Sequence, residues 1–253
     1  MRRVLLRAGI FLGFVSAVGF GLRQVFRTRK VVQPLEQVFY STNGVLKRTW
    51  FLSNVKVPFG EGLMTIDLND LQRCCRQYTQ IEAIHIVREF PNALRIQVQE
   101  YQPCAKLLLS KNGQRSVGLV SKEGVIFDPI QYDRRYFKTV PTVSDIPKRL
   151  IKNSKITGFP FVFRLLQFLN FNAPDVFQAV CGLSLKHFDP FLEKEWQTIE
   201  LDIGGHWTLV FPLERPEVAL ARFRSILQSL SPEQRKSLRR LNVARIRPTV
   251  EFL

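Results

Sequence analysis

The spacing of apolar and polar residues predicts a chain of short strands and amphipathic helices. Residues 35–40 alternate weakly, as a first strand would, and residues 45–54 place their apolar side chains on one helical face. Asp67 is suited to cap a second helix, because its carboxylate can accept hydrogen bonds from the first turn. The apolar positions of that helix follow the 3.6-residue period and are Leu68, Leu71, Cys75 and Tyr78.

A hairpin follows the second helix. Residues 84–90 and 94–98 each alternate with a period of two around a turn that Pro91 opens. The order strand, helix, helix, strand, strand predicts a two-layer unit in which both helices cover one face of a three-stranded sheet. At the end of the hairpin, Glu100 is predicted to be either a solvated strand end or a salt-bridge partner of Arg88. Pro103 lacks an N–H and is expected at an edge or a bulge.

The second half of the chain predicts a sheet with helices. Short strands are expected at 117–119, 125–127, 142–143, 183–185, 198–203 and 207–211. Residues 159–171 are too few to span a membrane and predict a buried helix, with a membrane-surface or partner-binding segment as the alternative. A helix is expected at 216–230, and Ser231 starts a further helical turn. Residues 241–253 alternate as one last strand, with Ala244, Ile246, Val250 and Phe252 on one face.

The N-terminal 30 residues carry the pattern of a membrane anchor. Residues 8–22 are uncharged and mostly apolar, and as a helix they would span only about 22 Å. Extended to residues 4–26, the helix reaches about 34 Å, enough to cross a bilayer if Arg7 and Arg23 reach the two interfaces. We therefore interpret this segment as a single-pass membrane anchor, with a cleaved signal peptide and a surface or buried helix as the alternatives. The body, residues 31–253, is placed outside the cytoplasm.

Charge and chemistry narrow the function further. The 253 residues carry a net charge of +16, which favours acidic partners such as a protein face, an anionic membrane or nucleic acid. The basic runs lack interleaved aromatic residues, and this argues against nucleic-acid binding. Three scattered histidines and four cysteines show no metal-binding spacing, although a disulfide between Cys75 and Cys104 is left open. No phosphate-binding loop, zinc-protease or serine-hydrolase motif is present, so we expect no cofactor and no enzyme activity.

Two stretches of the sequence carry a resemblance to a known family. The segments "GLMTIDLNDL" (62–71) and "IEAIHIVREFPNALRIQVQEYQPCA" (81–105) resemble the POTRA domain of the FtsQ/DivIB cell-division proteins, and "GLVSKEGVIFD" (118–128) is similar to the entry of that family into its β domain. The resemblance implies an α+β fold with an N-terminal transmembrane helix, a small POTRA domain (strand, helix, helix, strand, strand) and a mixed β-sheet domain with helices. We expect the boundaries at 1–30, 31–110 and 111–253.

The resemblance also implies a function. FtsQ/DivIB proteins are scaffolds of the divisome at the septum of the cytoplasmic (inner) membrane, and their last strands bind FtsB, which pairs with FtsL. Further septal proteins are expected to bind the POTRA domain. The partner contacts expected here are Arg245, Arg247, Thr249, Val250 and Phe252. Residues 242–245 depart from the acidic-aliphatic-Arg-Tyr signature that usually precedes this strand. The alternative function is a POTRA-containing envelope factor for outer-membrane protein assembly, although nothing in the chain resembles the strands of a membrane barrel.

Overall fold

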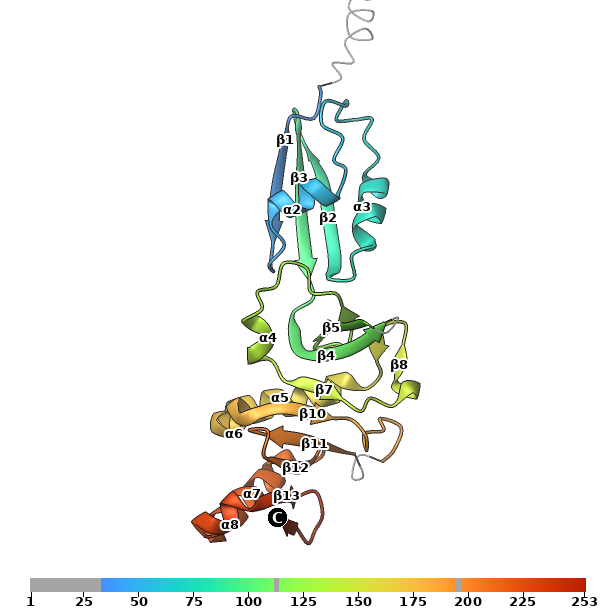
Figure 1. The fold of residues 1–253 in the computed structure, drawn as a ribbon. Helices are drawn as coiled ribbons and strands as arrows, with labels where there is room; N and C mark the ends of the chain where they lie inside the picture. Colours follow the sequence, from blue (N-terminus) through green and yellow to red (C-terminus); the bar gives the residue numbers. More distant parts are fainter. Residues whose placement is uncertain (1–32, 112–113, 194–196) are drawn as a thin grey trace, which may run out of the picture.

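The computed structural model describes residues 33–111, 114–193 and 197–253. Two sheets organise these residues into an N-terminal unit (residues 33–101) and a C-terminal unit (residues 102–253), which lie end to end (Figure 1). The predicted membrane anchor at residues 1–30 lies outside the described residues. Within the described residues, no helix combines the length and the apolar character needed to cross a membrane.

The N-terminal unit has the predicted order of elements. Its sheet has the strand order β1-β3-β2, with β1 parallel and β2 antiparallel to the central β3. Buried Leu94, Ile96 and Val98 of β3 pack in one cluster with Phe51 and Leu71 from the two helices, so the alternation along β3 sets the core face. The elements are β1 (Gln37–Thr42), α2 (Arg48–Asn54), α3 (Leu68–Arg76), β2 (Ile81–Glu89) and β3 (Ala93–Glu100).

The helix start predicted at Asp67 is confirmed. Its carboxylate accepts hydrogen bonds from the backbone N–H groups of Asn69 and Asp70, so two donors of the first turn that have no partner within the helix are satisfied. Cys75, on the inner face of α3, is fully buried.

The C-terminal unit is built on a nine-stranded mixed sheet. Its strand order is β14-β13-β12-β11-β10-β7-β4-β5-β6, with three parallel pairs (β4·β7, β7·β10 and β12·β13) among antiparallel ones. The strands are β4 (Pro103–Lys111), β5 (Gln114–Ser121), β6 (Ile126–Phe127), β7 (Thr142–Ser144), β10 (Val180–Ser184), β11 (Thr198–Ile203), β12 (Trp207–Pro212), β13 (Leu238–Asn242) and β14 (Thr249–Phe252).

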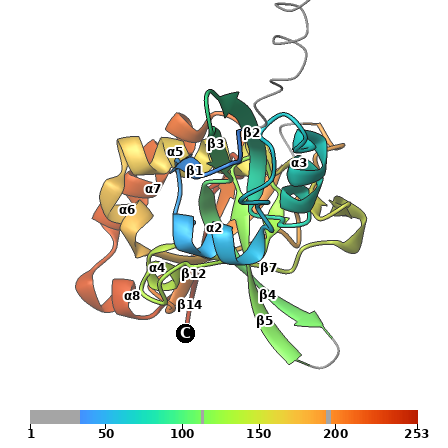
Figure 2. The same cartoon turned by 90° about the horizontal axis from the view of Figure 1, so that it is seen from above.

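The strand β4 was not predicted. It pairs with β5 in a long hairpin that extends away from the rest of the molecule (Figure 2). The register shifts between Pro103 and Ala105, so the bulge expected at Pro103 is present. The predicted domain boundary at residue 110 falls at the far end of this strand, and the division of the chain into domains stays a prediction.

The helices of the C-terminal unit supply much of its core. The stretch predicted as a buried helix forms α5, and its Val162, Leu166 and Leu169 pack in one cluster with strand residues and with Leu220 and Phe223 of α7. Ser231 and Gln234 form the predicted capping box. The remaining elements are α4 (Tyr136–Thr139), η1 (Lys148–Leu150), β8 (Ile151–Lys152), β9 (Lys155–Ile156), α5 (Phe159–Asn172), α6 (Pro174–Ala179), α7 (Pro216–Ser229) and α8 (Pro232–Lys236).

Both predictions for Glu100 are wrong, because its side chain is buried at the lower end of the N-terminal unit. The carboxylate accepts hydrogen bonds from the backbone N–H groups of Val45 (3.1 Å) and Leu46 (2.9 Å), which start the segment leading to α2. It also accepts from Thr42 Oγ1 at 2.5 Å and from Gln80 Nε2 at 2.6 Å. Arg88 instead donates to the backbone carbonyls of Leu63 and Ile66.

The same network joins the two units. Gln80 donates to Glu100 through Nε2, and its Oε1 accepts the backbone N–H of Ile130 at 2.7 Å. Gln131 Oε1 accepts the backbone N–H of Lys47 at 2.7 Å. The Ile130 side chain packs against the core of the N-terminal unit. The residues after β6 therefore fasten the C-terminal unit to the base of the N-terminal one.

Replacing Glu100 is expected to destabilise the N-terminal unit. Glu100→Ala leaves two backbone donors and the Gln80 amide without their acceptor, and we expect the free energy of unfolding to fall by about 3 kcal/mol. Glu100→Gln keeps one acceptor oxygen and should cost about half as much. Urea unfolding followed by tryptophan fluorescence measures the effect, and Trp50, which packs against Tyr78, is the tryptophan that reports on the N-terminal unit.

The control for this prediction is Glu82→Ala. Glu82 is exposed and accepts only from Gln99, so its loss should change the free energy of unfolding by less than about 0.5 kcal/mol. Gly44→Ala supplies a second test at the same carboxylate, because a Cβ on Gly44 would lie 2.3 Å from the Glu100 carboxyl carbon. Equal stability of Glu100→Ala and Glu82→Ala would contradict the role given to Glu100.

Candidate functional site

The candidate binding site is the free edge of the nine-stranded sheet. β14 is the terminal strand in the sheet order and pairs on one side only, with β13. The opposite terminal strand, β6, is contacted by the β8–β9 hairpin, since the Ile126 N–H donates to the Ser154 carbonyl and Val125 bridges to Lys155. A partner strand can therefore extend the described sheet at β14.

The prediction that residues 241–253 form one strand is wrong in its middle. β13 ends at Asn242, residues 244–247 form a bend, and β14 begins only at Thr249. Ile246, predicted on a core-facing position, is 89% exposed at the tip of this bend. The C-terminal segment is thus a hairpin in which β13 lies inside the sheet and β14 lies at its edge.

The bend has identifiable physical causes. The Asn242 side-chain oxygen accepts the backbone N–H of Ala244 at 3.0 Å, a local bond that competes with continued strand pairing. Arg222 of α7 donates to the carbonyl of Arg245 at 3.2 Å and holds the bend against the helix. Pro248 lacks an N–H and precedes the second strand. The alternation of apolar and polar residues in the sequence gives no information about these hydrogen bonds.

The backbone of β14 offers hydrogen-bonding groups outward. The N–H of Leu253 donates to the carbonyl of Ser237, so Leu253 points its backbone groups toward β13. Backbone direction alternates along an antiparallel strand, so Thr249 and Glu251 also face β13, whereas Val250 and Phe252 face outward. These two residues present the donors and acceptors that a partner strand would use.

The predicted contact residues lie together on this hairpin, although not on one strand. Arg245 and Arg247 lie exposed in the bend, whereas Thr249, Val250 and Phe252 belong to β14. Val250 packs partly against the core, while Phe252 is exposed. Their role as partner contacts stays a prediction.

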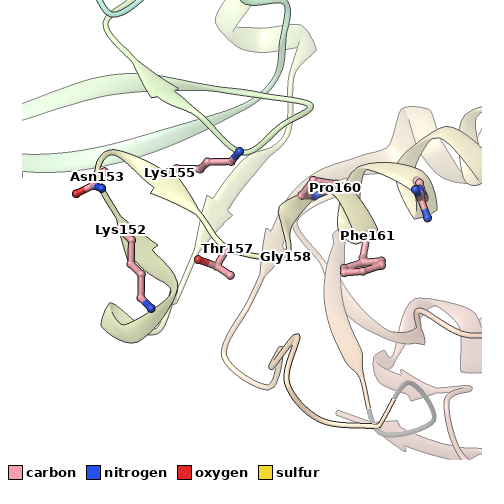
Figure 3. Close-up of a pocket in the computed structure, with 8 residues that line it drawn as sticks. Lys152, Asn153, Lys155, Thr157, Gly158, Pro160 and Phe161 are labelled. Atoms are coloured by element: carbon pink, nitrogen blue, oxygen red, sulfur yellow. The ribbon is translucent and has the colours of Figure 1, made fainter.

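The pocket shown in Figure 3 lies elsewhere in the C-terminal unit, where the β8–β9 hairpin meets the start of α5. It has a volume of about 540 Å³, and the Arg164 guanidinium stacks over Phe161 at 5.8 Å from the ring centre. Its lining contains no carboxylate, histidine or thiol, and the polar groups that it offers are lysine and arginine cations, the Asn153 amide and the Thr157 hydroxyl. The lining residues are Lys152, Asn153, Lys155, Thr157, Gly158, Pro160, Phe161 and Arg164.

Metal-binding chemistry finds no support in the described part of the chain. Residues 33–111, 114–193 and 197–253 hold no group of three His, Cys, Asp or Glu side chains that could bind a metal ion. All four cysteines are free, so the disulfide left open between Cys75 and Cys104 is absent. His206 is exposed in the β11–β12 turn.

Sequence reasoning missed the residues at the junction of the two units. Gln80, Ile130 and Gln131 are polar or isolated positions in loops, and no periodicity marks them. Chain order gave the only indication that Gln80 lies at the junction. Gln80 directly precedes β2, and β2 starts at the same end of the sheet at which β3 ends and the chain continues to Pro103.

The described residues form a small α/β unit followed by a larger unit built on a mixed β-sheet with helices. A family model described as "POTRA domain, FtsQ-type" matches residues 45–101. The chain is also 34% identical over 68 residues to the cell division protein FtsQ of Allochromatium vinosum, which covers 27% of this chain and 25% of that protein. The chain therefore contains an FtsQ-type POTRA domain, and its resemblance to the FtsQ/DivIB family is confirmed in that region.

Cys75 and Cys104 are expected to react slowly with a thiol-labelling reagent. Burial raises the pKa of both Cys75 and Cys104 to about 12, with the neighbouring Cys74 and Glu123 respectively as smaller causes. At pH 8 the thiolate population of each is then about 1,000-fold below that of an ordinary cysteine, so a maleimide should modify only the exposed Cys74 and Cys181 rapidly. Mass spectrometry counts the labels, and the unfolded chain should take four. Rapid labelling of all four in the folded protein would contradict this burial.

Proposed function

We propose that this chain is a non-catalytic scaffold of bacterial cell division. In this proposal residues 1–30 supply a single membrane anchor with its N-terminus in the cytoplasm, and residues 31–253 lie in the periplasm at the division septum. The partners are FtsB- and FtsL-type proteins at the C-terminal sheet, with further septal proteins at the POTRA domain. The FtsQ-type POTRA match supports the cell-division role, and the remainder of the chain is assigned by position and geometry.

The free edge at β14 is the observation that carries the proposal. A short segment of the partner would pair with β14 through the outward backbone groups of Val250 and Phe252. Exposed Phe252 offers an apolar contact on one face of the extended sheet. Main-chain hydrogen bonds supply affinity in this mode of binding, and the side chains at alternate positions supply specificity.

Charge gives the edge its selectivity. Arg245 and Arg247 lie exposed beside β14, and within the sheet Arg240 of β13 is already paired with Glu200 at 2.5 Å. The two arginines of the bend are thus among the exposed cations that a partner would meet as it approaches β14, together with Arg239 of β13. An acidic segment that flanks the partner strand would complement them, and such complementarity favours the encounter and fixes the register.

The edge-strand proposal predicts a division defect when the outward N–H of Val250 is removed. Depletion of the protein in its own bacterium should give filamentous cells with blocked septa, which the unaltered chain restores. Val250→Pro should fail to restore septation, because proline has no N–H for the partner strand. Val250→Thr keeps the N–H and the branched shape and should restore it. Microscopy scores cell length, and immunoblotting checks that both variants accumulate equally.

Two results of the depletion experiment would each contradict a different part of the proposal. Normal septation together with missing outer-membrane proteins would favour the assembly-factor alternative. Full restoration by Val250→Pro at normal levels would leave the cell-division role standing and remove β14 as the binding edge.

Reversing the charge of the bend should weaken partner binding. Arg247→Glu is expected to lower the affinity for an FtsB–FtsL-type pair about tenfold, about 1.4 kcal/mol, because it places like charges against the acidic segment. Arg235→Glu makes the same change at an exposed arginine of α8 and should leave affinity within about twofold. Biolayer interferometry with the detergent-purified full chain measures both. Equal losses in the two variants would indicate a general charge effect in place of a local contact.

A further inference from the structure

We infer that the end of the N-terminal unit where the chain enters is a membrane-contact surface. Three exposed apolar side chains lie there on loops: Phe59 (49% exposed), Met64 (65%) and Phe90 (69%). We call these residues the apolar rim. The inference extends the proposed function, since it rests on the predicted anchor in residues 1–30.

Hydrogen bonds hold the loops of the rim around the point of entry. The Gly60 N–H donates to the Leu35 carbonyl at 3.0 Å, and the Leu63 N–H donates to the Gln33 carbonyl at 2.8 Å. On the other side, the Glu36 N–H donates to the Asn92 carbonyl at 2.9 Å, next to the turn that carries Phe90. In Figure 1 the start of β1 and the β2–β3 turn lie at the same end of the molecule, opposite the C-terminal unit.

The length of the preceding segment places this end close to the bilayer. Residues 27–32 are six residues between the end of the predicted anchor at Phe26 and Gln33. Even fully extended, they span at most about 20 Å, so the rim is tethered within reach of the lipid headgroups. Apolar side chains held at that height can enter the boundary between headgroups and acyl chains, as the apolar faces of interfacial segments do.

Lipid is the occupant that this position favours. In the proposed function, partner proteins bind the free edge at β14, which lies at the opposite end of the molecule from the rim (Figure 1). The covalent link to the predicted anchor would keep the rim close to the membrane. The charges around the rim are mixed: Glu89 is paired with Arg95 at 2.7 Å, Glu36 accepts from Asn92, and Glu61 is exposed. We therefore expect the contact between the rim and the membrane to be apolar and to form without anionic lipids.

The test uses the full chain reconstituted in phosphatidylcholine vesicles, with Phe90 replaced by the photoreactive residue p-benzoylphenylalanine. After irradiation, mass spectrometry measures the lipid adduct. We expect its yield to be at least about fivefold above that of the same probe at Phe171, which is 86% exposed on α5 in the C-terminal unit. Raising the salt to about 0.5 M should leave the yield unchanged, because screening acts on charges and not on apolar contacts.

A second variant tests whether the rim acts as one surface. Phe59→Ser combined with Met64→Ser should lower the lipid adduct at position 90 by about half or more, since two of the three apolar contacts are lost. Both side chains are solvent-exposed, so the fold should be retained, and urea unfolding checks this.

The outcomes separate the inference from the proposed function. A chain that fails to float with the vesicles would overturn both the anchor and the rim. A chain that floats but gives equal adducts at positions 90 and 171 would overturn the rim alone. A crosslinked dimer at position 90 in place of a lipid adduct would assign the surface to a second copy of the chain and would also overturn it.

Discussion

The buried carboxylate of Glu100 is the interaction on which the arrangement of the molecule depends. Glu100 is the last residue of β3, and its carboxylate accepts the backbone N–H groups of Val45 and Leu46, which lead into α2. It also accepts the side-chain amide of Gln80, and the side-chain oxygen of Gln80 in turn accepts the Ile130 N–H of the C-terminal unit. A charged group at such a site is tolerable only because its oxygens are surrounded by donors. The Glu100 side chain thus connects the end of the sheet of the N-terminal unit to the C-terminal unit.

This coupling matters for a scaffold. In the proposed function, partners would bind at β14 and at the POTRA domain, which lie at different ends of the molecule, and the hydrogen-bonded junction would set the spacing between the two sites (Figure 1). Tyr101 adds to the junction by stacking on Phe127 at 6.0 Å between ring centres. Burial, with the charge of Glu100 as a smaller cause, also raises the pKa of Tyr132 above its ordinary value.

The two surfaces with proposed roles and the pocket at the start of α5 differ in chemistry. The edge at β14 offers backbone groups and arginines, which suit an extended acidic peptide. The rim at the chain entry offers exposed apolar side chains on tied loops, which suit lipid. The pocket at the start of α5 is lined by cationic side chains and one aromatic ring, and its lining contains no carboxylate, histidine or thiol. The described residues therefore present binding chemistry at several places.

The sequence by itself determined the elements whose cause is local. The cap at Asp67, the capping box at Ser231, the alternation of β3 and the buried face of α5 all follow from neighbouring residues. Only the tertiary structure decided the burial of Glu100, the pairing of β4 and the bend at residues 244–247. The first two depend on partners far away in the chain, Gln80 for Glu100 and β7 for β4, and the bend depends on Arg222 in addition to the local bond of Asn242. A pattern of apolar positions carries no information about such pairs, because contacts between distant residues form only when the chain has folded.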